Sequence, residues 1–332
     1  MVPVQLAKRV VGYRPQGKQS YEDTLRTLSE ASVETHFEAF KDIAWDSPEL
    51  AVDLDDERWI LPDADPLGRH PWYRSLPRER RIEVGRHRMA AIVKTGSQFE
   101  QLLLVGGTQF LAGLRNGNPE FRYFMHELTE ETHHIQMFQE FTNRVCPEVR
   151  GAPGWLVKGI PRIGRLGERF PALFFAIVLA GEEPIDHVQK DILRAGGHHP
   201  LLDRIMQVHI AEEARHIGFA HAFLEEHAAE LPLVRRWVLG VLAPLVMRLG
   251  ADAIMVPSKT DRAAMGIPED VVRDVWGDNA EAAKFRRDLF ADVRMLFDGI
   301  GLRGWSTRWA WRALGVDGRP ARYRAEPASA AA

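Results

Sequence analysis

The chain has 332 residues, of which 45% are hydrophobic and 27% charged, a composition that is ordinary for a soluble globular protein. Its formal net charge of −3 gives no electrostatic reason to expect binding to nucleic acid or to an anionic membrane surface. The single cysteine, Cys146, cannot form an internal disulfide and excludes thiolate metal clusters. The N-terminus lacks the apolar run of a signal peptide, so we expect a cytoplasmic protein.

The N-terminal part changes character twice. Residues 1–20 contain prolines and glycines without apolar periodicity, which predicts an extended arm. Residues 21–40 carry apolar side chains at helical spacing, which predicts a first helix. Five prolines and several aromatic residues fall within residues 45–77, and this composition indicates an ordered segment without long helices.

Four long helical patterns follow, each bounded by glycine or proline. They span about 78–115, 119–145, 167–195 and 200–231. Short connections join the first to the second and the third to the fourth, whereas about 20 residues separate the two pairs. This layout predicts an all-α, ferritin-like four-helix bundle, made of two hairpins with one long crossover.

Additional helices are predicted after the bundle, at 232–254, 269–276 and 280–297. We interpret Trp305 and Trp309 as residues that pack the core of the tail. We expect a single helical domain over residues 21–315 and a disordered, alanine-rich tail over residues 316–332.

Two apolar stretches, at residues 172–180 and 238–247, are the strongest candidates for membrane helices. Both fall short of the roughly 20 residues that a spanning helix needs. We therefore expect no membrane partner and interpret both stretches as buried helices of the bundle core.

The four central helices carry glutamates and histidines in a repeated pattern. Twice, a lone glutamate precedes a Glu-x-x-His pair by 31 residues: Glu100 with Glu131 and His134, and Glu182 with Glu213 and His216. A glutamate and a histidine three residues apart face the same side of an α-helix, so one pair can reach one metal ion. The pattern is typical of carboxylate-bridged dimetal sites in ferritin-like bundles.

Several of these residues have a neighbour of the same type, so the apolarity of each helix face must select among them. The face with Glu131 and His134 carries phenylalanines and leucine, whereas the face with Glu130 is more polar, which favours Glu131. The same comparison selects Glu213 over Glu212 and Glu182 over Glu183.

The alternative is that these glutamates are ordinary surface charges, since one Glu-x-x-His is expected by chance in a chain with 13 histidines. Chance does not explain the burial, because an ionised carboxylate on an apolar face costs several kcal/mol unless it is paired or metal-bound. Two divalent cations would cancel the charge of four such carboxylates. The repeat therefore favours a dimetal centre.

His209 breaks the symmetry of the two units. It lies one turn before Glu213 on the same side of the helix, and we interpret it as a third imidazole ligand. The matching position of the first unit is Glu127, which we interpret as a residue that supports a ligand, ahead of being a ligand itself. Asp186, one turn after Glu182, either orients a ligand histidine or lies at the edge of the pocket.

With these residues in place, the chain resembles the p-aminobenzoate N-oxygenase family of diiron proteins over about residues 20–315. The histidine one turn before the second Glu-x-x-His distinguishes that family from the common enzymes with four glutamates and two histidines. The resemblance implies a centre of two iron ions that activates O₂ and oxidises an aromatic amine toward hydroxylamine and nitro products. It also implies seven cluster ligands: Glu100, Glu131, His134, Glu182, His209, Glu213 and His216.

Cofactor and partners follow from the donor set and from the motifs. Mixed carboxylate and imidazole donors suit redox-active iron, with manganese as a substitute. The sequence has no Gly-rich dinucleotide fingerprint, so we expect a separate electron donor of the reductase or ferredoxin type. A homodimer through long helices is a further expectation. Lys94 is the one cation near the expected pocket on its helix, and it does not establish an aromatic acid as the substrate.

Three other functions remain open at this point. The first is a diiron hydroxylase or desaturase that acts on C–H bonds, which a long apolar pocket would favour over a short one with polar anchors. The second is a ferritin-like iron-binding protein, although the aromatic face around Glu131 argues against the solvent access that iron storage needs. The third is a zinc hydrolase that uses His209, Glu213 and His216, which would leave the other glutamates without a role.

Overall fold

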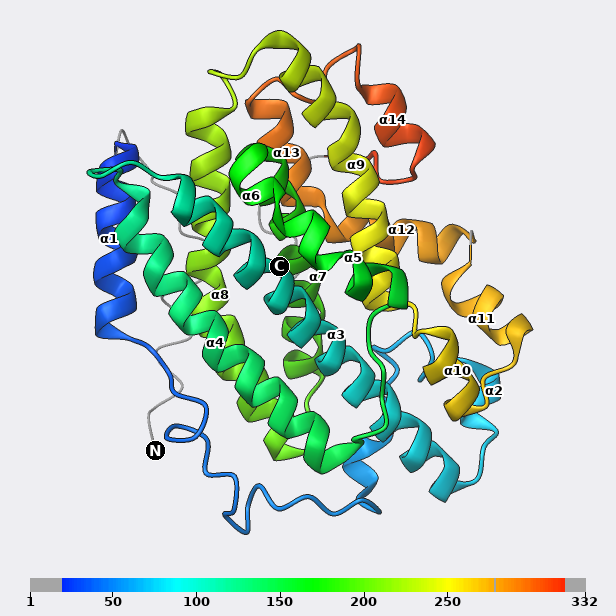
Figure 1. The fold of residues 1–332 in the computed structure, drawn as a ribbon. Helices are drawn as coiled ribbons and strands as arrows, with labels where there is room; N and C mark the ends of the chain where they lie inside the picture. The colour runs from blue at the N-terminus through cyan, green and yellow to red at the C-terminus, as the bar shows by residue number, and fades with distance from the viewer. Residues whose placement is uncertain (1–19, 278, 320–332) are drawn as a thin grey trace, which may run out of the picture.

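The computed structural model describes residues 20–277 and 279–319. These residues form helices and connecting loops without a β-strand, which confirms the predicted all-α class (Figure 1). The arm predicted for residues 1–20 lies outside the described residues except for Ser20, which caps the first helix. Most of the tail predicted for residues 316–332 also lies outside them.

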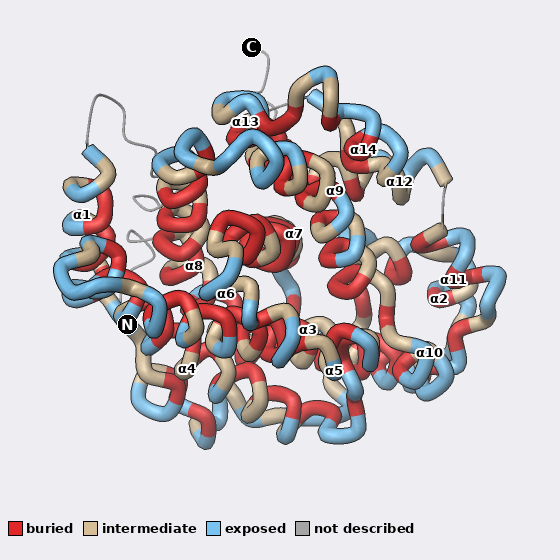
Figure 2. The backbone as a smooth tube through the Cα atoms, turned by 45° about the horizontal axis from the view of Figure 1, so that its top comes forward, coloured by how far each residue is buried: buried red, intermediate tan, exposed pale blue. Residues whose placement is uncertain are grey.

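A four-helix bundle forms the centre of the molecule. Its helices are α3 (Arg78–Gly113), α4 (Glu120–Val145), α7 (Pro171–Ala195) and α8 (Pro200–His227). Helix α3 packs on α4, and α7 packs on α8, as the two predicted hairpins require. Figure 2 shows α7 in the middle of the fold and buried on nearly all sides. This burial explains why its first half is almost entirely apolar.

Other helices surround the bundle. Helix α1 (Tyr21–Glu34) packs on α4 and α8, and α9 (Leu233–Met255) packs on α7. The crossover contains α5 (Gly154–Gly164) and α6 (Leu166–Arg169), both of which pack on α3. Helix α9 approaches α7 closely at Gly250, where a Cβ atom would lie 2.5 Å from the carbonyl oxygen of Ala180. Only glycine permits this approach.

The remaining helical segments are short. They are η2 (Glu57–Trp59), α2 (Pro71–Arg74), α10 (Lys259–Met265), α11 (Glu269–Trp276), α12 (Ala280–Leu289), α13 (Ala291–Gly299) and α14 (Arg308–Ala313). The single helix predicted for 280–297 is therefore wrong, because the chain leaves helical geometry at Phe290. The first helix ends at Glu34 rather than near residue 40, and the crossover helix α5 was not predicted.

The tryptophans of the tail differ from the prediction. Trp305 and Trp309 are 95% and 57% exposed, whereas Trp311 is fully buried and donates a hydrogen bond from Nε1 to the carbonyl oxygen of Gly240. Because both side chains are exposed, the interpretation of Trp305 and Trp309 as core residues is wrong.

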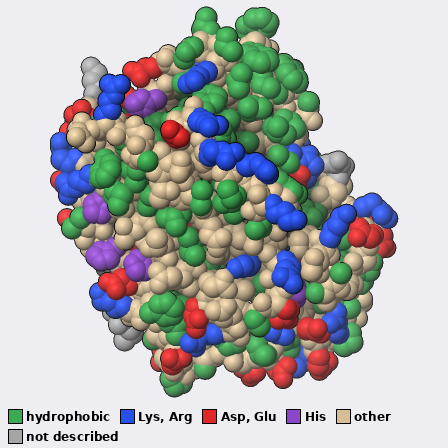
Figure 3. All heavy atoms as spheres, in the orientation of Figure 1, with side chains coloured by type: hydrophobic (Ala, Val, Ile, Leu, Met, Phe, Trp, Pro, Cys, Tyr) green, Lys and Arg blue, Asp and Glu red, His purple; other side chains and the backbone are tan. Residues whose placement is uncertain are grey.

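Hydrophobic side chains also gather on the surface at the top of the view in Figure 3, where α9 begins.

The second apolar stretch is longer than the sequence pattern indicated. By length and composition, the segment Leu233–Met265 could cross a membrane, and 56% of its most apolar window is buried inside the protein. Core helices of soluble proteins pass the same test, and Leu239, Ala243 and Met247 are fully buried here. The burial of these residues agrees with a core helix.

Candidate metal centre

The structure brings the seven predicted ligands into the interior of the bundle. Each of its four helices contributes at least one: α3 carries Glu100, α4 carries Glu131 and His134, α7 carries Glu182, and α8 carries His209, Glu213 and His216. All seven side chains are at most 1% exposed. Such a concentration of carboxylates and imidazoles in an apolar bundle requires partners that neutralise it.

Six of these residues form two overlapping groups. Within each group, one donor atom of every residue lies within 4.8 Å of those of the other members. The first group contains Glu100, His134, His209 and Glu213, and the second contains Glu131, His134, Glu213 and His216. His134 and Glu213 belong to both. Glu182 lies close to them, since, besides burial, the charges of Glu213 and Glu131 both raise the pKa of its carboxyl group.

The imidazole nitrogens have a consistent orientation. Nδ1 of His216 lies 2.8 Å from both Glu131 Oε1 and Glu213 Oε1, and Nδ1 of His134 lies 3.2 Å from Glu131 Oε2. His209 instead points its Nε2 inward, 3.1 Å from Glu100 Oε1. Each histidine therefore directs one nitrogen at the shared interior and has its other nitrogen available for a supporting contact.

Glu130 and Glu212 make two of these supporting contacts. Nε2 of His134 lies 2.8 Å from Glu212 Oε2 on α8, and Nε2 of His216 lies 2.7 Å from Glu130 Oε2 on α4. Each Glu-x-x-His pair is thus held by the glutamate that precedes the other pair. A carboxylate in this position makes Nε2 the protonated nitrogen and leaves Nδ1 free to bind a cation.

The prediction that Glu130 lies on a polar, more exposed helix face is wrong. Glu130 is 3% exposed and Glu212 is fully buried, because Arg215 reaches both of them. Arg215 Nη2 lies 2.9 Å from Glu130 Oε1 and 3.7 Å from Glu212 Oε1. Glu212 also accepts a hydrogen bond from the backbone N–H of Phe37, which ties the segment after α1 to the centre. The repeated Glu-Glu doublets in the sequence were the signal that could have revealed this network.

The third supporting contact comes from α7. Gln189 Oε1 lies 2.9 Å from Nδ1 of His209, so it fixes which nitrogen of this ring faces inward. Sequence reasoning proposed Asp186 as one candidate for such a role. Asp186 instead pairs with Lys190 at 2.7 Å. The only sequence signal for Gln189 is its position two turns after Glu182.

Glu127 is the most unusual residue near the centre. It is fully buried, and among the described residues no hydrogen-bond donor reaches either of its carboxylate oxygens. Burial raises the pKa of Glu127 well above its usual range, while nearby His216 opposes this shift. Its side chain therefore lies close to the centre, and its role as a supporting residue stays a prediction.

The electrostatics of the centre fit bound cations. Burial and the charge of Glu131 raise the pKa of Glu100, and burial and the charge of Glu213 raise that of Glu182. Burial lowers the pKa of His209 to about 3, so this imidazole is neutral and can act as a ligand. In the described part of the chain, no donor reaches Oε2 of Glu100, Glu182 or Glu213. Unpartnered buried carboxylate oxygens of this kind are the ligands that divalent cations take.

Lys94 does not lie in a substrate pocket. Its ammonium group contacts Gln139 Oε1 on α4 at 2.5 Å, and its side chain passes beside Gly151 in the crossover. The structure thus places this cation on the α4 side of α3. It supplies no anchor for a substrate carboxylate beside the centre.

Comparison with known proteins agrees with this site. The sequence matches the p-aminobenzoate N-oxygenase AurF family over residues 18–301. It is also 45% identical to uncharacterized proteins from Mycobacterium bovis and from two strains of Mycobacterium tuberculosis, over 92% of this chain and 91% of theirs. The match spans all four bundle helices and every residue of the candidate centre. The chain belongs to the p-aminobenzoate N-oxygenase family.

Proposed function

We propose that this protein is an O₂-dependent non-haem diiron oxygenase that N-oxygenates an aromatic amine. The observation that carries the proposal is the pair of overlapping donor groups, which are fully buried and share His134 and Glu213. Family membership supports the same chemistry. The two groups together would hold the two iron ions, with Glu182 beside Glu213.

The donor set supports iron over zinc. Zinc in structural sites prefers thiolates, and the one cysteine, Cys146, lies apart from both donor groups. Carboxylates and imidazoles suit iron, and manganese as a substitute. Two iron ions held together supply two electrons to O₂ when they are bound.

The protein's own residues have three tasks in this proposal. Glu130 and Glu212 hold the Nε2 protons of His216 and His134, so that both rings present Nδ1 to the ions. Gln189 contacts Nδ1 of His209, so this ring presents Nε2 instead. Buried aromatic side chains exclude water from the bundle around the centre; they are Phe124, Phe138 and Phe219, each at most 1% exposed.

The remaining parts of the proposal concern partners. We propose that electrons come from a separate reductase or ferredoxin-type donor, that the protein acts in the cytoplasm without a membrane or nucleic-acid partner, and that it forms a homodimer. Support comes from the sequence patterns alone for these points. Single-turnover reactions with a chemical reductant separate the oxygenase chemistry from the identity of the donor.

A direct test uses iron-loaded, chemically reduced protein with ¹⁸O₂ and a panel of aryl amines, fatty acids and aromatic acids. We expect ¹⁸O-labelled hydroxylamine or nitro products by mass spectrometry. Glu213→Ala should abolish them, because Glu213 belongs to both donor groups, whereas Glu140→Ala on the outer face of α4 should not. Labelled alcohols from C–H substrates, with no labelled product from any amine, would refute N-oxygenation.

One observation favours a second candidate, a diiron hydroxylase or desaturase. A cavity next to α3 and α7 is lined by apolar residues, as a substrate with reactive C–H bonds would require. The same panel distinguishes the two functions. An iron-storage role is less well supported, because the full burial of the donor groups restricts the exchange of iron with solvent.

A further inference from the structure

An apolar cavity of about 210 Å³ lies outside the seam between α3 and α7. Helices α5, α6 and α9 form its other walls. Trp155 on α5 and Leu249 on α9 are 52% and 39% exposed, so the cavity opens to solvent beside them. Phe99 and Ala180 are buried and form its inner wall.

The inner wall lies on the two helices that carry Glu100 and Glu182. Phe99 precedes Glu100 on α3, and Ala180 lies two residues before Glu182 on α7. Between them, Gly181 faces the Phe99 ring so closely that a Cβ atom would lie 2.8 Å from Phe99 Cδ1. The Phe99 ring therefore packs between α3 and α7 at the inner end of the cavity, at the level of two predicted ligands.

The chemistry of the cavity is uniform. Its lining consists of aliphatic and aromatic side chains and Gly250, without a charged side chain, and the indole N–H of Trp155 at the open end is its single side-chain donor. Lys94, the nearest cation on α3, is paired with Gln139 on α4, and Lys158 on α5 is exposed and outside the lining. A carboxylate buried at the inner end of this cavity, beyond Trp155, would lose its hydration without gaining a charged partner.

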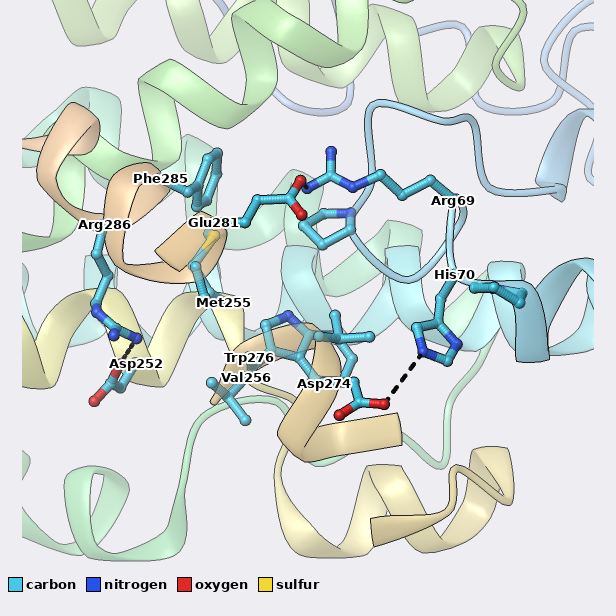
Figure 4. A pocket seen from close by; sticks show the side chains of 14 residues that line it. Arg69, His70, Asp252, Met255, Val256, Asp274, Trp276, Glu281, Phe285 and Arg286 are labelled. Carbon is cyan, nitrogen blue, oxygen red and sulfur yellow. Dashed lines mark ion pairs between the residues drawn. The ribbon is translucent and has the colours of Figure 1, made fainter. Parts of the chain in front are cut away.

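A second cavity does not compete for this role. It has a volume of about 260 Å³ and lies between residues 66–71 and helices α9, α11 and α12, with no residue of the centre in its lining. Its charged side chains pair with one another, for example Arg286 with Asp252 and His70 with Asp274 (Figure 4). Charges that are already paired offer little to an anionic substrate.

We propose that the apolar cavity binds the ring of a neutral aromatic substrate and excludes ring carboxylates such as p-aminobenzoate. This inference rests on the proposed oxygenase function, because it takes the reacting group to pass Phe99 toward the centre. The volume fits the assignment: an apolar cavity of about 150 Å³ accommodates benzene, so about 210 Å³ accommodates one ring with a small alkyl substituent.

Isothermal titration calorimetry on the full-length, iron-loaded protein tests the proposal under anaerobic conditions, where no turnover occurs. The probes are aniline, p-toluidine, p-ethylaniline and p-aminobenzoate. Each added methylene should tighten binding about fourfold, the equivalent of about 0.8 kcal/mol, until the cavity is full. p-Aminobenzoate should bind at least about tenfold more weakly than p-toluidine, which has a similar size.

Matched variants locate the binding site. Ile177→Trp fills the cavity from α7 and should weaken p-ethylaniline binding at least about tenfold. Ile217→Trp makes the same change at a half-buried position of α8 outside the lining and should leave binding within about twofold. Trp155→Ala removes an exposed wall residue, which the fold tolerates more easily, and should also weaken binding several-fold.

The outcomes separate this inference from the proposed function. Binding of p-aminobenzoate as tight as that of p-toluidine, or unchanged p-ethylaniline binding in both Ile177→Trp and Trp155→Ala, would overturn the cavity assignment whatever the enzyme does. If the neutral probes bind as expected and the loaded enzyme oxidises none of them, the assignment stands and the oxygenase proposal fails.

Discussion

The contact between Glu212 and His134 allows a quantitative prediction. Glu212 Oε2 lies 2.8 Å from His134 Nε2, and Glu212 Oε1 accepts from the backbone N–H of Phe37 at 2.9 Å. Glu212→Ala leaves the buried His134 Nε2 without an acceptor, at a cost of about 1–3 kcal/mol in the free energy of unfolding, and the half-buried N–H of Phe37 adds a smaller loss. The imidazole of His134 also loses the group that fixes its tautomer. Loss of a supporting contact of this kind lowers metal affinity or activity by about 10–100-fold.

The assay compares three variants by iron competition against a chelator, followed by single-turnover product yield. Glu212→Ala should lose affinity and yield, whereas Glu212→Gln keeps a carbonyl acceptor for His134 and should recover most of both. Glu140→Ala removes an outer carboxylate that pairs with Arg144 on α4 and controls for a general loss of charge. Wild-type iron affinity and yield in folded Glu212→Ala would refute the positioning role of Glu212.

Three further predictions concern pH, iron and stability. Burial raises the pKa of Glu100, so above pH 4.5 the unfolded chain loses a proton that the folded chain retains, and the metal-free wild type loses stability as pH rises. Glu100→Gln lacks this proton and should gain stability relative to the wild type above pH 4.5; a constant difference in the free energy of unfolding at all pH values would contradict this. Ferrous iron should stabilise the folded chain by about 2.7 kcal/mol at 100 times its Kd, and denaturation curves that ignore iron would show that no such site forms. Asp261 accepts hydrogen bonds from the backbone N–H groups of Arg150 and Gly151 and contacts His87. Asp261→Ala should therefore lower the free energy of unfolding by about 2–5 kcal/mol without changing the iron content of the folded protein, and a loss of iron without a loss of stability would contradict this structural role.

Much of the bundle could be predicted from the sequence, because its information is local. The four long helices show strong apolar periodicity and end at glycine or proline, and the equal spacing between Glu100 and Glu131 and between Glu182 and Glu213 selects one register. The structure then places these residues on the interior faces of four packed helices. A pattern that repeats over long helices leaves few alternatives.

The network around the ligands was less accessible to prediction. Glu130 was set aside because its own helix face is polar, but its burial comes from His216 and Arg215 on α8. Trp305 and Trp309 show the converse, since their helical spacing predicts packing, whereas both are exposed among residues 20–277 and 279–319. In both cases the deciding contact comes from a distant part of the chain, which a periodicity within one helix cannot reveal.

The central claim is that the bundle holds two iron ions, and metal analysis after anaerobic reconstitution tests it most directly. The account predicts two iron atoms per chain in the wild type, and loss of bound iron in Glu213→Ala, because Glu213 belongs to both donor groups. A single zinc ion per chain that survives the substitution of Glu100, Glu131 and Glu182 would contradict it.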